Sequence, residues 1–301
     1  MRLVTPSRLA QKARKGNYGV PAFNSNGANY DITRACMEAA QELQSPLILQ
    51  VYEPNAVYRG FGYFVQQVKY LYDFLEMDIP LAVNLDHGKS LESCLSAICA
   101  GFSGVMIDAS HLPLDNNCVV TAEVVRVAHA LGVSVEAEVG YVGGNSKNPV
   151  GSSPGMYEIP QKPSGPLLYS NPDEVRKFLD TVDIDLLAVS VGTVHGVYKE
   201  QTEIDFNLVR EINGFSSVPL VQHGTGGVSP ELLRNLVEAG MAKVNFGEPL
   251  RLNYIRYFVD EAQNSEHQWH TWRIMESIKE RLKLYVKEQI LALKAEGRAN
   301  I

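Results

Sequence analysis

Three histidines in this chain of 301 residues follow short apolar runs, and carboxylates accompany them. His87 follows Asp86 in NLDHGKS, His195 lies in GTVHGVYK, and His223 lies in QHGTGG. Three neutral imidazoles with one open coordination position form a typical catalytic zinc site. Taken alone, His87 is more simply explained as a loop histidine before the helix that Ser90 begins. The zinc hypothesis therefore requires a fold that brings the three histidines together.

The histidines belong to a regular alternation of short apolar segments with longer amphipathic ones. Eight segments are predicted as strands: residues 19–24, 46–52, 79–86, 104–110, 134–140, 186–192, 218–224 and 243–247. Residues 30–43 and 229–240 are typical of the helices between them, and the second has a helix start at Ser229-Pro230 and Gly240 at its end. Strands that are apolar nearly throughout indicate a parallel sheet covered by helices.

Eight strand–helix units predict a single (β/α)8 TIM barrel over residues 1–301. The alternative is a doubly wound open sheet, which normally has a glycine-rich phosphate turn after its first strand; NSNGAN at 24–29 matches that turn poorly. Residues 143–174 are rich in Gly, Pro and Ser and are predicted to form a long active-site loop. Residues 265–301 are predicted to form a C-terminal helical extension.

The carboxyl ends of all barrel strands meet at one face, and this face carries the active site. Imidazoles, carboxylates and one amide are expected there: His87, Asp108, Glu136, Glu138, His195, His223 and Asn245. Glu136 and Glu138 share one face of their strand, and Glu138 is nearer the rim and better placed to reach a metal. Asp86 adjoins a metal ligand in sequence and is better suited to transfer a proton.

The bulk composition excludes several classes of partner. The net charge is −7 and there is no block of Lys and Arg, so neither nucleic acid nor an anionic membrane is an expected partner. No apolar run reaches the roughly 18 residues that a bilayer span needs, and the N-terminal segment lacks an apolar signal core. We expect a cytoplasmic protein whose four cysteines are free thiols.

The order of four motifs resembles the class II, metal-dependent ketose-bisphosphate aldolases, the family of the fructose- and tagatose-bisphosphate aldolases. These motifs are NLDHG, VEAEVGYVGG, LAVSVGTVHGVYK and PLVQHGTGG, and the resemblance extends over essentially the whole chain. It implies reversible aldol cleavage of a ketose or ketose phosphate to a dihydroxyacetone-type fragment and an aldehyde, through a metal-stabilised enediolate. It also implies Zn²⁺, a monovalent cation (Na⁺ or K⁺) and a homodimer or homotetramer.

The resemblance assigns roles residue by residue. His87, His195 and His223 match the zinc ligands of the family. Glu138 and Asp108 match carboxylates that approach the metal or hold a second position, and Asp86 matches the catalytic acid/base. The residues expected to bind a sugar or sugar phosphate are Asn24, Gly196, Lys199, Gly224, Asn245, Gly247 and Glu248.

The sequence departs from the family pattern around the substrate. Tyr52 and Gly226 occupy positions where the family has Ser, and Glu248 replaces a Thr that meets phosphate. A carboxylate at position 248 would repel a phosphate or would hydrogen-bond a hydroxyl instead. The acidic loop of the family is also missing, and the residues that could replace its proton donor are Tyr141, Tyr157 and Tyr169.

These departures leave several hypotheses open. The backbone amides of Gly196, Gly224 and Gly247, together with Lys199, could still bind a phosphate. Otherwise the substrate is a non-phosphorylated or atypical ketose or keto acid. A metal-dependent isomerase or epimerase would share the same first step, and a non-catalytic paralogue is the remaining alternative.

Overall fold

The computed structural model describes residues 3–25, 29–142, 168–199, 203–264 and 270–300. Its centre is a closed barrel of eight parallel strands, each paired with its neighbours in sequence and the first with the last. The strands are β1 Val20–Asn24, β2 Leu47–Tyr52, β3 Leu81–Gly88, β4 Gly104–Ile107, β5 Ser134–Val139, β6 Leu186–Val189, β7 Leu220–Gln222 and β8 Met241–Phe246. The predicted TIM barrel is confirmed, and the open-sheet alternative is wrong because β1 pairs with β8.

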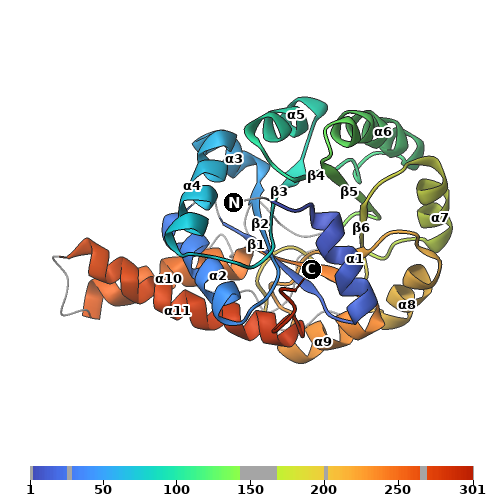
Figure 1. Ribbon diagram of the computed structural model, residues 1–301. Coiled ribbons are helices and arrows are strands. Elements are labelled where there is room, and N and C mark those ends of the chain that lie inside the picture. The colour runs from blue at the N-terminus through green and yellow to red at the C-terminus, as the bar shows by residue number, and fades with distance from the viewer. Residues whose placement is uncertain (1–2, 26–28, 143–167, 200–202, 265–269, 301) are drawn as a thin grey trace.

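Most helices surround the barrel on its outside, and α1 (Pro6–Gly16) lies across one end of it, in contact with β1, β3, β5 and β8 (Figure 1). The helices are α1 Pro6–Gly16, α2 Tyr30–Glu42, α3 Glu53–Arg59, α4 Phe61–Phe74, α5 Leu91–Ala100, α6 Leu114–Ala130, α7 Pro172–Thr181, α8 Phe206–Phe215, α9 Pro230–Ala239, α10 Glu248–Asn264 and α11 Thr271–Ala292. The last two run side by side and extend beyond the ring of helices (Figure 1). Within the described part of the chain, no helix combines the length and apolar character that a membrane span requires.

Local sequence signals set the helix boundaries. At the start of α9 the Ser229 hydroxyl accepts a hydrogen bond from the Leu232 N–H, and Pro230 is the first residue of the helix. Gly240 follows the end of α9 with a φ of 128°. In the same way Asn171 caps α7, which begins at Pro172. Residues 172–174 of the predicted active-site loop therefore belong to a helix. Residues 143–167 of that loop lie outside the described residues.

The interior of the barrel is polar near the site. Glu136 on β5 contacts Lys243 on β8, and because these strands are not neighbours the contact crosses the interior. Residues two apart on one strand face the same side, so Glu138 and Asn245 point inward as well. Buried polar groups destabilise a fold unless they are paired. A polar interior thus marks the region of the barrel where a functional site is expected.

Candidate active site

Asp86 and His87 are adjacent in sequence, yet both face the same cavity. Regular strand geometry would send them to opposite faces of the sheet. The pairing of β3 with β4 shifts register between Leu85 and Gly88, and His87 has a left-handed φ of 51°. This bulge redirects the His87 side chain into the interior. The bulge also requires the glycine at position 88, since a Cβ there would lie 2.7 Å from the Met106 carbonyl oxygen.

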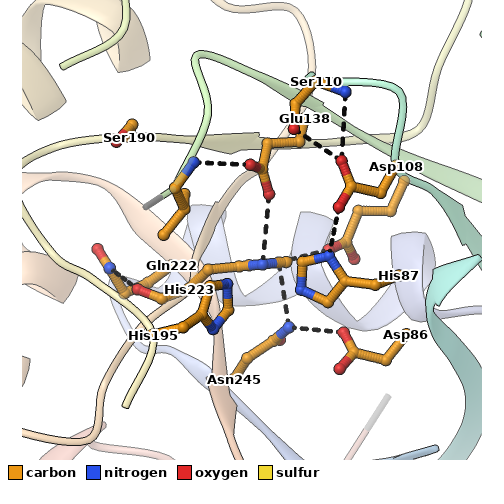
Figure 2. A network of polar contacts seen from close by, with 12 residues as sticks. Asp86, His87, Asp108, Ser110, Glu138, Ser190, His195, Gln222, His223 and Asn245 are labelled. Atoms are coloured by element: carbon orange, nitrogen blue, oxygen red, sulfur yellow. Dashed lines mark hydrogen bonds and ion pairs between the residues drawn. The ribbon is translucent and has the colours of Figure 1, made fainter. Parts of the chain in front are cut away.

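The three histidines form one cluster (Figure 2). The ring centroid of His87 lies 5.1 Å from that of His195 and 4.8 Å from that of His223. One nitrogen of each ring lies within 4.8 Å of the corresponding nitrogens of the other two. His87 comes from the end of β3, while the other two follow β6 and β7. The structure therefore brings together the histidines that the sequence predicted to converge.

His87 is held by a carboxylate. Its Nδ1 lies 2.8 Å from Oδ2 of Asp108, and Oδ1 of Asp108 accepts hydrogen bonds from the backbone and hydroxyl of Ser110. Burial favours neutral His87, but the charges of Asp86 and Asp108 outweigh it and raise the pKa of His87 to about 10. Asp108 occupies Nδ1, which leaves Nε2 as the nitrogen that can bind a metal. A metal bound there would displace the proton.

His223 lies below the cavity and is completely buried. Its Nε2 lies 3.0 Å from Oε1 of Glu136. Its Nδ1 lies 3.5 Å from Oε2 of Glu138 (Figure 2). Neither Nδ1 of His223 nor Oε2 of Glu138 makes a hydrogen bond with any described residue. Burial raises the pKa of Glu138, and the nearby charge of Asp108 raises it further.

Two unpartnered buried acceptors beside two further imidazoles fit a metal cation. The possible ligand groups in the described part of the chain are His87 with His195 and His223, and His87 with Asp108 and Glu138. Three histidine nitrogens with an adjacent carboxylate are a donor set that suits Zn²⁺. The set has an open side, because His87 and His195 also line the cavity.

Asp86 is held by two amides. Oδ2 accepts a hydrogen bond of 2.7 Å from the Asn24 side chain, and Oδ1 accepts one of 3.3 Å from the Asn245 side chain. Asn24 is itself oriented by the Tyr52 N–H, which donates to its Oδ1. The carboxylate is therefore fixed next to the histidine cluster, where it could transfer a proton.

Glu248 begins α10 and faces a histidine. Its Oε1 lies 3.6 Å from Nδ1 of His195. Burial raises the pKa of the Glu248 carboxyl, but the interaction with His195 outweighs burial and lowers this pKa to about 2. The carboxylate that the sequence placed among substrate-binding residues thus also contacts a candidate metal ligand.

A cavity of about 290 Å³ opens above the histidines. Its lining includes ten of the predicted site residues: Asn24, Asp86, His87, Asp108, Glu138, His195, Gly224, Asn245, Gly247 and Glu248. His223 is buried below it, while Gly196 and the exposed Lys199 are not part of the lining. Tyr141 lines the cavity, whereas Tyr169 lies elsewhere and donates its hydroxyl hydrogen to the Glu203 carbonyl. Tyr157 lies outside the described residues.

The glycines after β7 are packed against the loop after β6. Gly224 has a left-handed φ of 68°. A Cβ at Gly226 would lie only 1.7 Å from the Gly196 carbonyl oxygen, so no side chain fits at this position without a backbone shift. The serine that the family pattern has at position 226 is therefore incompatible with this arrangement of the two loops.

Sequence reasoning missed several residues that the structure places at or beside the site. Lys89, Arg251 and Gln50 line the cavity, and Lys243 contacts Glu136 beneath it. The signal for Lys243 was its position two residues before Asn245 on one strand, which gives both side chains the same inward direction. Arg251 lies one helical turn after Glu248, so the start of α10 directs both toward the cavity.

Comparison with known proteins identifies the family. The model of class II fructose-bisphosphate aldolases matches residues 4–298. This decides the assignment. The chain belongs to the class II fructose-bisphosphate aldolase family. It is a class II aldolase, a carbon–carbon lyase.

Relatives of this aldolase cover most or all of its length. It is 39% identical to the fructose-bisphosphate aldolase of Geobacillus stearothermophilus over 246 residues, which are 81% of this chain and 80% of that protein. It is 35% identical to the fructose-bisphosphate aldolase of Staphylococcus aureus, covering 99% of this chain and 100% of that one. The crystal structure of the YdjI aldolase from Escherichia coli K12 has a TM-score of 0.82 at 25% identity, covering 99% of this chain and 100% of that one.

Proposed function

We propose that this aldolase is zinc-dependent and catalyses the reversible aldol cleavage of a ketose phosphate to a dihydroxyacetone-type fragment and an aldehyde. The observation that carries the proposal is the position of Asp86. Two side-chain amides fix its carboxylate, and it shares one cavity with His87 and His195. A proton-transfer group beside a metal-binding cluster is the arrangement that metal-assisted aldol chemistry needs.

His87, His195 and His223 would hold the metal. Zn²⁺ at this position supplies positive charge that polarises the ketone and adjacent hydroxyl oxygens of the substrate. Glu138 and Asp108 lie close enough to approach the metal or to hold a second position, because both share a possible ligand group with His87. The monovalent cation that the resemblance implies remains a prediction.

Asp86 would move the proton at the carbon–carbon bond that is cleaved. In the cleavage direction its carboxylate accepts the proton of the hydroxyl on the carbon that becomes the aldehyde. Asn24 and Asn245 hold its two oxygens in place, so little reorganisation is needed when the proton moves. In the condensation direction Asp86 returns the proton to the same oxygen.

A sugar phosphate is the substrate class that the relatives' names support. Lys89 and Arg251 line the cavity and supply positive charge for an anionic group. The backbone at Gly224 and Gly247 also lines it, while the roles of Gly196 and Lys199 remain predictions. The homodimer or homotetramer likewise remains a prediction.

One observation favours a second candidate, an aldolase that acts on a non-phosphorylated or atypical ketose or keto acid. The Glu248 carboxylate lines the cavity and stays ionised, because His195 lowers its pKa. Such a group would repel a phosphate and would accept a hydrogen bond from a sugar hydroxyl.

The test is aldol condensation with several aldehydes, using dihydroxyacetone phosphate or free dihydroxyacetone as the donor, with and without a chelator. We expect chelator-sensitive condensation with the phosphorylated donor. Asp86→Asn should lower kcat by about 100-fold or more, the usual contribution of a general acid or base. Tyr169→Phe is the control, because the Tyr169 hydroxyl forms its hydrogen bond with the Glu203 carbonyl and Tyr169 does not line the cavity.

Three outcomes separate the alternatives. Condensation of only the free ketone would favour the non-phosphorylated substrate. Retention of full activity in the chelator would contradict zinc dependence. Failure to condense either donor despite bound zinc would exclude both aldolase proposals.

A further inference from the structure

Lys243 is among the largest side chains that are completely buried in this protein. A buried ammonium group is costly unless a carboxylate and further hydrogen bonds compensate its charge. Nζ lies 2.7 Å from Oε2 of Glu136, which is equally buried, and 2.8 Å from Oδ1 of Asn245. Neither Lys243 nor Glu136 lines the cavity, so neither is placed to touch a substrate.

The first connection from this pair leads to His223. The second oxygen of Glu136 lies 3.0 Å from Nε2 of His223. A carboxylate that pairs with the Lys243 ammonium only accepts hydrogen bonds, so the hydrogen of the neutral imidazole lies on Nε2. This leaves a lone pair on Nδ1, the atom that faces Glu138 without a hydrogen bond.

The second connection leads to Asp86. An ammonium group only donates hydrogen bonds, so Lys243 turns the amide oxygen of Asn245 toward itself. The amide nitrogen then points the other way, where it lies 3.3 Å from Oδ1 of Asp86 and 3.1 Å from Nε2 of His223. Because this Nε2 carries a hydrogen, the amide of Asn245 donates to Asp86 (Figure 2).

We propose that Lys243, together with Glu136, is a positioning residue for two catalytic groups at once. Through Glu136 it fixes the imidazole of His223 with Nδ1 toward the metal position. Through Asn245 it fixes the proton-transferring carboxylate of Asp86. A buried ion pair that stabilises the barrel alone would not need both connections. The proposal rests on the proposed function for the identity of the metal.

The test measures metal binding rather than turnover alone. Lys243→Met and Glu136→Gln are compared with the wild type for the zinc Kd, by competition with a chromophoric chelator, and for the visible spectrum of the Co²⁺-substituted protein. Loss of a group that orients a metal-binding histidine typically weakens metal affinity by about 10- to 100-fold. We expect that loss in both variants, together with a changed Co²⁺ spectrum and a lower kcat.

Lys279→Met is the matched control. Lys279 on α11 is also buried and forms an ion pair of 2.9 Å with Glu38 on α2, and neither residue lines the cavity or belongs to a possible ligand group. This variant should unfold at a lower temperature than the wild type, and it should bind zinc with an unchanged Kd.

Lys243→Met leaves Glu136 buried without its cation and could fail to fold. Two other variants then serve for the test. Glu136→Gln keeps the shape of the side chain, and the double variant Lys243→Met/Glu136→Gln removes both charges. An unchanged zinc Kd and Co²⁺ spectrum in the folded variants would overturn the proposal. Zinc binding without aldol activity in the wild type would instead contradict the proposed function and leave this proposal standing.

Discussion

Each candidate metal ligand of this aldolase, and the candidate proton-transfer group, lies against a second side chain. Asp108 holds His87, Glu136 holds His223, Glu248 approaches His195, and two amides hold Asp86. Carboxylates therefore outnumber cations around the histidines. A divalent metal would offset part of this negative charge, and a phosphorylated substrate would add to it. The few cations of the cavity lining then become decisive for substrate affinity.

Arg251 gives a prediction at the residue scale. Its side chain lines the cavity, and its positive charge helps to lower the pKa of the Glu248 carboxyl. Arg251→Met should raise the KM for dihydroxyacetone phosphate about tenfold or more, because a hydrogen bond to a charged group contributes about 1.5–3 kcal/mol. The KM for free dihydroxyacetone should change little, and this donor is the internal control.

Arg251→Lys separates charge from geometry. A lysine keeps the positive charge but cannot form the paired hydrogen bonds that a guanidinium makes with phosphate. We expect its KM for the phosphorylated donor to fall between those of the wild type and Arg251→Met. Equal increases of KM for both donors in Arg251→Met would mean that the side chain shapes the cavity and does not bind the phosphate.

At the scale of elements, the sequence predicted the strands well and their geometry only in part. Apolar runs located all eight strands, and the residues that follow those runs located the three histidines. The bulge at His87 was not predictable, because it depends on the pairing of β3 with β4 rather than on local residues. Strand β8 begins at Met241, two residues before the predicted start at Lys243. The charge of Lys243 interrupts the apolar pattern and hid the first two residues of this strand, and contacts with Glu136 on β5 and with Asn245 make that buried charge tolerable.

The packing of α11 along α2 gives a prediction about pH. Glu38 on α2 accepts hydrogen bonds from Lys279 on α11 and from Arg34. Burial alone raises the pKa of Glu38, but the two cations outweigh burial and lower it. A lowered pKa in the folded state stabilises the protein above the unfolded pKa of about 4.3, and this stabilisation is lost as the pH falls through the folded pKa.

Glu38→Gln measures this contribution. At pH 7 the variant should have a lower free energy of unfolding than the wild type by about 1.5–3 kcal/mol, the usual contribution of a hydrogen bond to a charged group. The difference should shrink as the pH is lowered below about 4, which urea unfolding at several pH values would measure. A difference that stays constant across this range would mean that the carboxylate charge of Glu38 does not contribute.

At the scale of the whole molecule, the predicted barrel explains why residues far apart in sequence could be grouped. The rule that strand ends meet at one face was sufficient to bring His87, His195 and His223 together without any knowledge of contacts. This rule does not show which residues deeper in the barrel contact the site, so Lys243 was overlooked. It also could not place Glu248 beside His195, because this depends on where α10 begins.

The metal position joins distant parts of the barrel, and this leads to a prediction for the whole fold. The three histidines follow β3, β6 and β7, so a bound metal links segments that are separate in the unfolded chain. A ligand that binds only the folded state stabilises it by about 4 kcal/mol at 1,000 times its Kd. Excess zinc should therefore raise the Tm in calorimetry relative to the chelator-treated protein.

His195→Ala serves as the control for this shift. It removes one candidate ligand that is partly exposed, so the fold should survive the substitution. The zinc-dependent rise in Tm should be much smaller in this variant, because two histidines bind the metal more weakly than three. An equal rise in both proteins would place the zinc elsewhere, and no rise in the wild type would contradict a metal site at the end of these strands. A rise confined to the wild type would connect the stability of the whole barrel to the three histidines that are proposed to bind the metal.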